Sequence, residues 1–246
     1  MTVSSPSPTR RLEGRIALVT GASRGIGAAV ARRFAAEGAH LILVARTQGA
    51  LEELDDEIRA IGGTATLCPF DLTDYPAIDR LGAAIFERWK RLDVLVANAA
   101  LLGTLTPLAH IRPQEWDQVL AVNLTANWRL IRSLDPLLRA SPSGRAIFVT
   151  SGAAQGMRAY WGTYAVSKAA LEMLAMTYAA ETQKTNLRVN LLDPGRTRTA
   201  MRAAAYPGED PATLPPPEHV CDLMVELASA ECTRHGERVV VQAAGQ

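Results

Sequence analysis

Short runs of aliphatic and β-branched residues alternate with longer amphipathic stretches along most of the chain. The short runs have the length and unbroken apolar character of buried parallel strands, whereas apolar positions in the longer stretches recur at helical spacing. The predicted strands are 16–20, 41–45, 65–68, 94–97, 146–150, 187–192 and 238–241. The predicted helices run to about 37, from 51 to 61, from 75 to 90, from 114 to 139 and to about 181.

This alternation predicts an α/β protein of the Rossmann type, with three αβα layers and a doubly wound parallel sheet of about seven strands. Residues 14–246 are expected to form one domain, because neither a repeat nor an interdomain linker interrupts them. Residues 1–13 are expected to be a disordered tail. Residues 196–217, rich in Pro, Ala and Thr, break the pattern and are expected to form a mobile substrate lid.

Composition removes several classes of partner. The chain has 246 residues, 26 basic and 25 acidic, with a net charge of +1, so there is no electrostatic case for nucleic acid or an anionic membrane. Three scattered cysteines predict neither a disulfide framework nor a zinc site. The four histidines show no metal-ligand spacing, and we predict no metal. Without an apolar run of about 18 residues or a signal peptide, we expect a cytoplasmic protein.

A glycine-rich turn lies between the first predicted strand and its helix, with Gly21, Gly25 and Gly27. Glycines there permit a tight turn and a close approach of the backbone to a pyrophosphate, and the helix N-terminus favours the anion. An ordinary glycine-rich connection is the alternative reading. The strand–turn–helix context favours dinucleotide binding.

Discrimination between NAD and NADP usually falls at the end of the second strand, where an acid would hold the ribose 2′-hydroxyl. This chain has Ala45 and Arg46 there, and Arg24 lies inside the glycine turn. Two guanidiniums suit a 2′-phosphate, which favours NADP(H) over NAD(H). Arg46 as a merely solvated residue at the start of a helix is the alternative.

Tyr164 and Lys168 stand one helical turn apart, and Ser151 follows a predicted strand upstream. On a helix, positions i and i+4 share a face, so the phenol and the ammonium can point into one cleft. A neighbouring cation favours phenolate and lowers a tyrosine pKa toward the working range. Alone this spacing is weak evidence, because chance often produces it.

These motifs together resemble the short-chain dehydrogenase/reductase (SDR) family from about residue 14 onward. The resemblance implies a catalytic tetrad of Asn123, Ser151, Tyr164 and Lys168. It implies cofactor contacts from Gly21, Ser23, Arg24, Gly25, Ile26, Gly27, Arg46, Asp71, Leu72, Asn98, Ala99, Tyr164, Lys168, Pro194, Gly195, Thr197 and Thr199. Segments 101–103, 161–164 and 196–202 are similar to the bacterial YciK-like branch. Two departures are Ala100, where the family has glycine, and an ending without Asp-Gly-Gly.

The family implies an NADP(H)-dependent oxidoreductase that interconverts a carbonyl and an alcohol. Tyr164 would be the general acid or base, Lys168 would lower its pKa and hold the nicotinamide ribose, and Ser151 would bond the substrate oxygen. Asn123 would hold a water in a proton relay through Lys168. The alternatives are a catalytically silent dinucleotide sensor or scaffold, and an NAD-dependent enzyme of the same fold.

The expected partner is a small carbonyl or alcohol. Candidate apolar pocket residues are Leu101, Leu102, Met157, Tyr160, Trp161 and Met201. Arg158, Arg196, Arg198 and Arg202 cluster near the predicted cleft and either bind an anionic substrate or are simply solvated. The family implies a homotetramer or homodimer through helix 114–139 and the Tyr164 helix.

Overall fold

Seven parallel strands form one sheet in the computed structural model, which describes residues 10–241. Their order is β3-β2-β1-β4-β5-β6-β7. The strands are β1 (Ile16–Thr20), β2 (His40–Ala45), β3 (Thr64–Pro69), β4 (Val94–Ala97), β5 (Arg145–Val149), β6 (Arg188–Asp193) and β7 (Arg238–Val240). The strand order reverses between β1 and β4, which is where ligands of such sheets bind. The predicted α/β class and the seven strands are confirmed.

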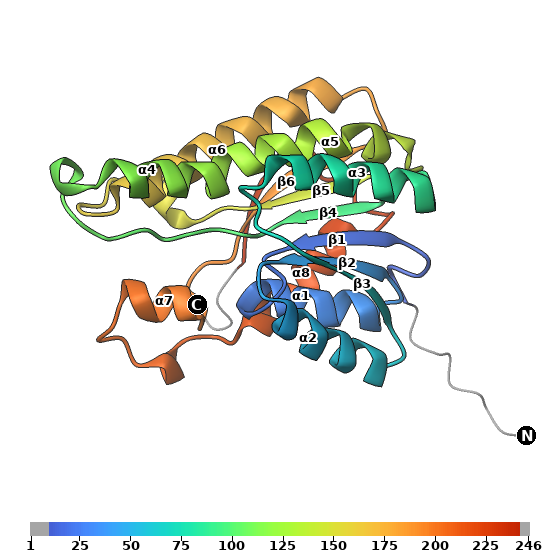
Figure 1. Ribbon diagram of the computed structural model, residues 1–246, viewed down its shortest axis with the longest axis horizontal. Helices are drawn as coiled ribbons and strands as arrows, with labels where there is room; N and C mark the ends of the chain where they lie inside the picture. Colours follow the sequence, from blue (N-terminus) through green and yellow to red (C-terminus); the bar gives the residue numbers. More distant parts are fainter. Residues whose placement is uncertain (1–9, 242–246) are drawn as a thin grey trace, which may run out of the picture.

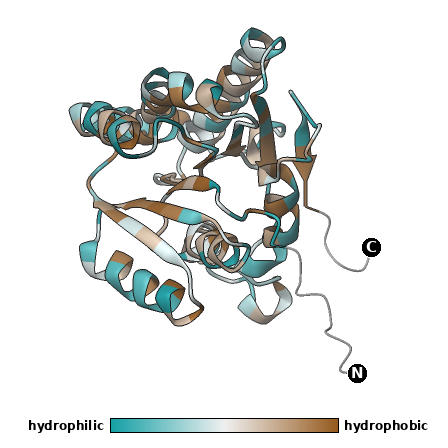
Figure 2. Ribbon diagram, turned by 90° about the vertical axis from the view of Figure 1, so that its right-hand side faces the viewer, coloured by the Kyte–Doolittle hydropathy of each residue, from teal (hydrophilic) through white to brown (hydrophobic). Residues whose placement is uncertain are grey.

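Helices cover both faces of the sheet and complete three layers (Figure 1). One face carries α1 (Gly25–Ala36), α2 (Gln48–Ala60) and α8 (Cys221–Ala228). The other carries α3 (Tyr75–Trp89), α4 (Pro113–Leu120), α5 (Ala126–Ala140) and α6 (Gly162–Thr182). Figure 2 shows hydrophobic residues gathered in the strands and hydrophilic ones on the outward helix faces.

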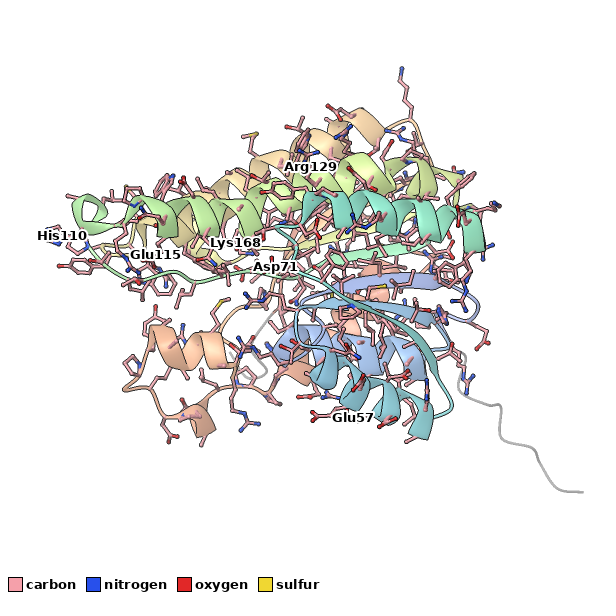
Figure 3. The ribbon with its side chains drawn as sticks, viewed as in Figure 1. Glu57, Asp71, His110, Glu115, Arg129 and Lys168 are labelled. Atoms are coloured by element: carbon pink, nitrogen blue, oxygen red, sulfur yellow. The ribbon has the colours of Figure 1, made fainter. Side chains whose placement is uncertain are left out.

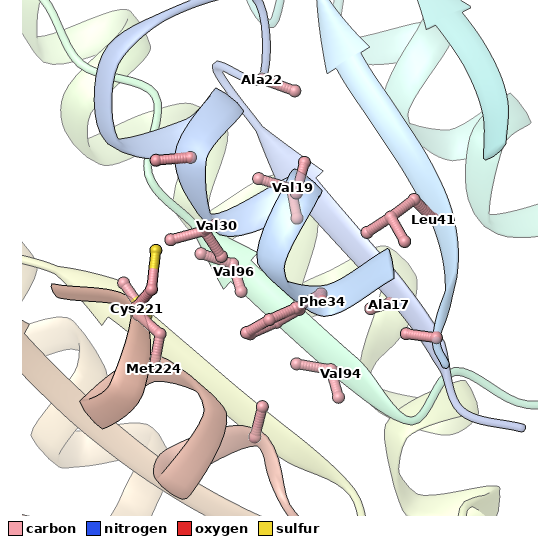
Figure 4. Packing of buried hydrophobic residues seen from close by; sticks show 14 of the residues in the cluster. Ala17, Val19, Ala22, Val30, Phe34, Leu41, Val94, Val96, Cys221 and Met224 are labelled. Carbon is pink, nitrogen blue, oxygen red and sulfur yellow. The ribbon is translucent and has the colours of Figure 1, made fainter. Parts of the chain in front are cut away.

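The core divides into two clusters, one on each side of the sheet. Phe34 of α1 and Met224 of α8 pack against β1 and β4 side chains such as Val19 and Val96, and all four are fully buried (Figure 4). Helix α8 had no predicted counterpart. It is only eight residues long and apolar, a pattern that periodicity alone does not separate from a strand.

Residues 10–13 were expected to belong to a disordered tail but are part of the folded domain. Residues 10–13 form a turn in which Leu12 is fully buried and its N–H donates to the Glu37 carbonyl at 3.0 Å. A single leucine among charged residues carries no periodic signal, and only its contact with the α1 face makes it part of the core. The expectation for residues 1–9 lies outside the described residues.

Two other segments contain elements that the sequence did not predict. Helix 114–139 is interrupted by a π-helical turn, Ala121–Thr125, between α4 and α5. Segment 196–217 contains helix α7 (Ala200–Ala205) and a 3₁₀ turn, Pro211–Thr213, so much of it is regular structure. In Figure 1, α7 projects beside the sheet, beyond the carboxyl ends of its central strands.

Candidate functional site

A cavity of about 830 Å³ opens at the carboxyl ends of the central strands, between the glycine turn and α7. Of the predicted site residues, those that line it are Gly21, Ser23, Arg24, Gly25, Ile26, Arg46, Asp71, Leu72, Asn98, Ala99, Ser151, Tyr164, Lys168, Pro194, Gly195, Thr197 and Thr199. Figure 3 labels Asp71 and Lys168, which both belong to this lining. Gly27 and Asn123 do not line it. Tertiary structure therefore brings together segments that are far apart in sequence.

The glycine turn is shaped by close backbone contacts. A Cβ on Gly27 would stand 2.2 Å from the Gly21 carbonyl oxygen, a distance that no side chain tolerates. Gly21 itself has φ +65°, and a Cβ there would lie 2.9 Å from the Cα of Ala99. The turn therefore packs against β4 and leaves room beside the α1 N-terminus for a phosphate group.

Thr20 and Asn98 hold this turn against the end of β4. The Thr20 hydroxyl accepts hydrogen bonds from the backbone N–H groups of Asn98 at 3.0 Å and Ala99 at 3.1 Å. The Asn98 side-chain amide donates to the carbonyl of Thr20 at 3.0 Å and to that of Gly21 at 3.3 Å. Asn98 thus positions the turn, a role that the sequence pattern did not assign to it.

Tyr164 and Lys168 lie near the start of α6 and are both buried. The Lys168 ammonium donates to the Val149 carbonyl at 2.7 Å and lies 5.9 Å from the Tyr164 ring centre. Burial lowers the pKa of Lys168 to about 8, while the charges of Asp193 and Glu172 act to raise it.

The pKa of Tyr164 differs from the expectation that Lys168 would lower it. Burial raises the pKa of Tyr164 to about 12; the Ser151 hydroxyl opposes this rise and the charge of Asp193 adds to it. Desolvation outweighs other influences because the phenol lies within the protein, where the charged form loses its hydration. With this pKa the Tyr164 phenol keeps its proton at neutral pH.

Ser151 lies at the end of β5, at the N-cap of the 3₁₀ turn Gly152–Ala154. Its backbone is extended, and its hydroxyl accepts a hydrogen bond from the Ala153 N–H at 3.2 Å. The cap explains why a serine suits this position structurally. The same hydroxyl also lines the cavity beside Tyr164, so the two roles are compatible.

Asn123 is fully buried inside the π-helical turn. Its side chain accepts from the Leu101 N–H at 2.8 Å and donates to the Leu101 carbonyl and the Ser167 hydroxyl, each at 2.9 Å. The Asn127 amide donates to the Asn123 carbonyl at 2.8 Å. Asn123 therefore ties the segment after β4 to α6, and neither its side chain nor its carbonyl is bonded to Lys168 in the described part of the chain.

Arg46 lies at the end of the cavity where the second strand terminates. It is exposed and forms an ion pair of 3.7 Å with Asp71. Partial burial acts to raise the pKa of Asp71, but hydrogen bonds from Thr73 and the charge of Arg46 hold it below its ordinary value. Arg24 is exposed in the same cavity. Two arginines therefore line this cavity, and one of them is paired with a carboxylate.

The four arginines considered for anionic substrates differ in their partners. Glu209 accepts from Arg196 at 2.5 Å and from Arg202 at 2.5 and 2.7 Å, so one carboxylate engages two guanidiniums. Arg158 donates to the Tyr206 hydroxyl at 3.1 Å and does not line the cavity. Arg198 lines the cavity and forms no ion pair within residues 10–241.

Aromatic and apolar side chains form the wall next to Tyr164. Leu101, Leu102, Trp161 and Met201 line the cavity, as does Val122, which sequence reasoning missed. The Trp161 ring meets Tyr164 edge-on at 5.9 Å and Tyr206 at 5.6 Å. Of the other apolar candidates, Met157 and Tyr160 point to solvent and are absent from the lining. Neither Tyr206 nor Glu209 belongs to a recognisable motif, so only the fold reveals them.

Within residues 10–241, neither a metal-binding cluster nor a membrane-spanning helix is present. Among residues 10–241, His, Cys, Asp and Glu side chains do not gather in groups of three that could hold a metal ion. In the same part of the chain, every helix is too short or too polar to cross a lipid bilayer.

Comparisons with known proteins agree with this geometry. The family model for short chain dehydrogenases matches residues 15–210. The oxidoreductase YciK of Escherichia coli is 38% identical over 226 residues, which cover 91% of this chain and 89% of YciK. A short chain dehydrogenase from Shigella flexneri complexed with NADP has a TM-score of 0.92 and 36% identity over 96% of this chain and 100% of that one. One from Escherichia coli complexed with NADPH has a TM-score of 0.91 and 37% identity, with the same coverage.

Proposed function

The chain belongs to the short chain dehydrogenase family, and on that premise we propose that it is an NADP(H)-dependent oxidoreductase that interconverts a carbonyl and an alcohol. The observation that carries this proposal is that Tyr164 and Lys168 line the same cavity as the glycine turn. A proton donor and a dinucleotide cradle within one cavity are what carbonyl reduction requires.

The cradle fits a dinucleotide on steric and electrostatic grounds. Gly21 and Gly27 leave no side chain between the β1–α1 turn and its surroundings, and the α1 N-terminus faces the cavity. The cofactor supplies or accepts the hydride when bound. Asp71, Leu72 and the segment Pro194–Thr199 would complete its binding surface.

Preference for NADP(H) is supported by the charges at the Arg46 end of the cavity. Arg24 and Arg46 would meet a 2′-phosphate, whereas an NAD-selective site would place an acid where Arg46 stands. The two similar structures that are complexed with NADP and NADPH also support this preference for NADP(H). Arg46 would exchange its single contact with Asp71 for charge-assisted bonds to phosphate.

In this proposal Tyr164 donates a proton to the carbonyl oxygen during reduction and accepts one during alcohol oxidation. Its raised pKa keeps the phenol protonated at neutral pH, as a proton donor in reduction must be. Ser151 would donate a hydrogen bond to the same oxygen as negative charge develops. Lys168 would orient the cofactor ribose while Val149 holds its ammonium. Asn123 would position the Leu101 segment and α6.

The substrate that suits the cavity is apolar around its carbonyl. Leu101, Leu102, Trp161 and Met201 line the same cavity as Tyr164, and Glu209 forms ion pairs with both Arg196 and Arg202. Arg198 is the remaining cation on this wall, and it is our candidate partner for a substrate carboxylate.

The deciding experiment is a panel of aldehydes and ketones, each in neutral and carboxylate forms, with NADPH and NADH oxidation followed separately. Turnover with NADPH would support the proposal. If neither cofactor were oxidised with any member while NADPH still bound, the protein would be a dinucleotide-binding sensor that lacks turnover.

We also propose that the protein is a homo-oligomer in the cytoplasm. Trp128 of α5 and Val166 and Met173 of α6 expose apolar side chains to solvent, and Met173 is 69% exposed. Such exposed apolar groups on adjacent helices are typical of association surfaces. Light scattering on Met173→Glu and the wild type would test this, since dissociation of an oligomer by the variant is the expected result.

A further inference from the structure

Beneath Tyr164 and Lys168 lies a network of charged side chains that family motifs do not include. Glu172 follows Lys168 by one turn of α6, Asp193 ends β6, and Arg238 begins β7. Arg238 donates to Glu172 at 2.9 Å and to Asp193 at 2.7 Å, so one guanidinium bridges both carboxylates. The Arg238 side chain is 23% exposed, that of Glu172 13% and that of Asp193 7%. This burial strengthens the interactions between them.

Glu172 also holds the loop that carries Ser151. One of its oxygens accepts from the Thr150 hydroxyl at 2.7 Å, and the other accepts from the Gln155 amide at 2.8 Å. Thr150 and Gln155 stand on either side of Ser151 in the chain. The orientation of the serine loop relative to α6 is therefore set through Glu172.

Asp193 holds a second segment of the cavity lining, the turn after β6. Its second oxygen accepts from the Gly195 N–H at 2.9 Å, which shapes the turn that lines the cavity after β6. Through Arg238, this turn is connected to Glu172 and hence to both the serine loop and α6. Three separate parts of the site thus share one bridging side chain.

The network also determines the electrostatic surroundings of Lys168. Glu172 from α6 and Asp193 from β6 are the carboxylates that act on Lys168, and Tyr164 is the neighbouring titratable group. Arg238 neutralises part of the negative charge of both carboxylates. Two cations and two anions therefore occupy this region, and loss of any one unbalances it.

We propose that Glu172, Asp193 and Arg238 are positioning residues that hold the Ser151 loop, α6 and the Pro194–Gly195 turn in register, and that Arg238 balances the two carboxylates facing Lys168. This inference rests on the proposed function for its catalytic meaning. The charge balance around Lys168 can be measured from the titration of this lysine, without turnover.

The experiment is a carbon-13 NMR titration of the lysine Cε groups. The chain has three lysines, Lys90, Lys168 and Lys184, so Lys168 is assigned by the signal missing from Lys168→Arg. Glu172→Gln should lower the Lys168 titration midpoint by about one pH unit, because a neighbouring anion is lost. Arg238→Gln should raise it by about as much, because the carboxylates then act without a counter-charge.

Opposite shifts from two neighbouring substitutions separate charge balance from simple loss of packing. The double variant should return the midpoint close to the wild-type value. Arg234→Gln is the matched control, because Arg234 pairs with Glu226 and Glu237 at the surface and should leave Lys168 unchanged. If Arg238→Gln fails to fold, Arg238→Lys takes its place, because it keeps the positive charge and loses the bridge between the two carboxylates. This variant should keep the Lys168 titration midpoint and disturb only the loop that carries Ser151.

Kinetics on any carbonyl that the wild type reduces then test the catalytic meaning. Arg238→Gln and Glu172→Gln should each lower kcat by roughly tenfold, with a smaller effect on the KM for NADPH. Midpoints that do not move in either variant would overturn the inference, even in an active enzyme. Midpoints that move as expected in a protein without turnover would instead contradict the proposed function alone.

Discussion

The Lys168 ammonium donates a 2.7 Å hydrogen bond to the Val149 carbonyl, so helix α6 is fastened to the last residue of β5. Ser151 lies two residues beyond that carbonyl, and Tyr164 lies one turn before the lysine. The bond therefore fixes the serine and the tyrosine relative to each other across the mouth of the cavity.

Tyr164→Phe should lower turnover by roughly 10²- to 10⁴-fold, because the ring is kept and the proton donor is lost. NADPH affinity should change little, and fluorescence titration measures it directly. Tyr178→Phe is the matched control, since Tyr178 is also buried in α6 but bonds to Asp135 away from the cavity. Retained turnover in Tyr164→Phe would remove the tyrosine from its role as acid.

Lys168→Met should alter how stability depends on pH. The pKa of Lys168 is about 8 in the folded protein and 10.5 ordinarily, so between these values the unfolded chain holds a proton that the folded one has released. Stability of the wild type relative to the variant should therefore rise with pH by about 2 kcal/mol between pH 8 and pH 10. Urea unfolding at several pH values measures this difference. A flat difference across the window would mean that Lys168 titrates normally.

Arg46→Asp should shift cofactor preference toward NADH by roughly tenfold or more, because a carboxylate there repels a 2′-phosphate and can accept from a ribose hydroxyl. Lys184→Asp, at an exposed position beyond α6, controls for net charge. The ratio of kcat/KM for the two cofactors is the measurement, and an unchanged ratio would exclude Arg46 from cofactor selection.

Gly27→Ala should weaken NADPH binding more than tenfold, because the new methyl would meet the Gly21 carbonyl at 2.2 Å and distort the turn. Gly49→Ala provides the comparison, since Gly49 lies in α2 with open space around it and should be stabilised by roughly 0.5–1 kcal/mol. Calorimetry gives the affinity, and thermal melting shows whether each variant folds. Normal NADPH affinity in Gly27→Ala would mean that the turn does not bind the cofactor.

Glu209→Gln should loosen segment 196–217 and change substrate preference, because Arg196 and Arg202 lose the carboxylate that joins them. Faster hydrogen exchange in this segment is expected, together with a several-fold gain in kcat/KM for carboxylate-bearing carbonyls over neutral ones. Glu226→Gln removes a carboxylate that pairs with Arg234 at the surface and should change neither. Unaltered exchange in Glu209→Gln would show that the pairs do not restrain the segment.

Local patterns were sufficient for most of the architecture. Apolar runs such as Ile16–Thr20 and Val94–Ala97 are buried on both faces of a parallel sheet, so they carry a strong signal in composition alone. The glycine turn and the Tyr164–Lys168 spacing are likewise local, because each depends on the geometry of one turn or one helix. Helix α8 and the buried Leu12 lacked such signals and depended on the surfaces that cover them.

By itself, the sequence determined the α/β class, the succession of strands and helices along the chain, and the family resemblance. Periodicity and motif spacing are properties of residues that are close in the sequence, so they can be recognised before the chain is folded. Only the tertiary structure decided which charges meet. Glu209 joins Arg196 and Arg202, Arg238 joins Glu172 and Asp193, and burial raises the pKa of Tyr164. Partners far apart in sequence and the loss of water around a buried group arise only when the chain is folded, and these decide the chemistry of the site.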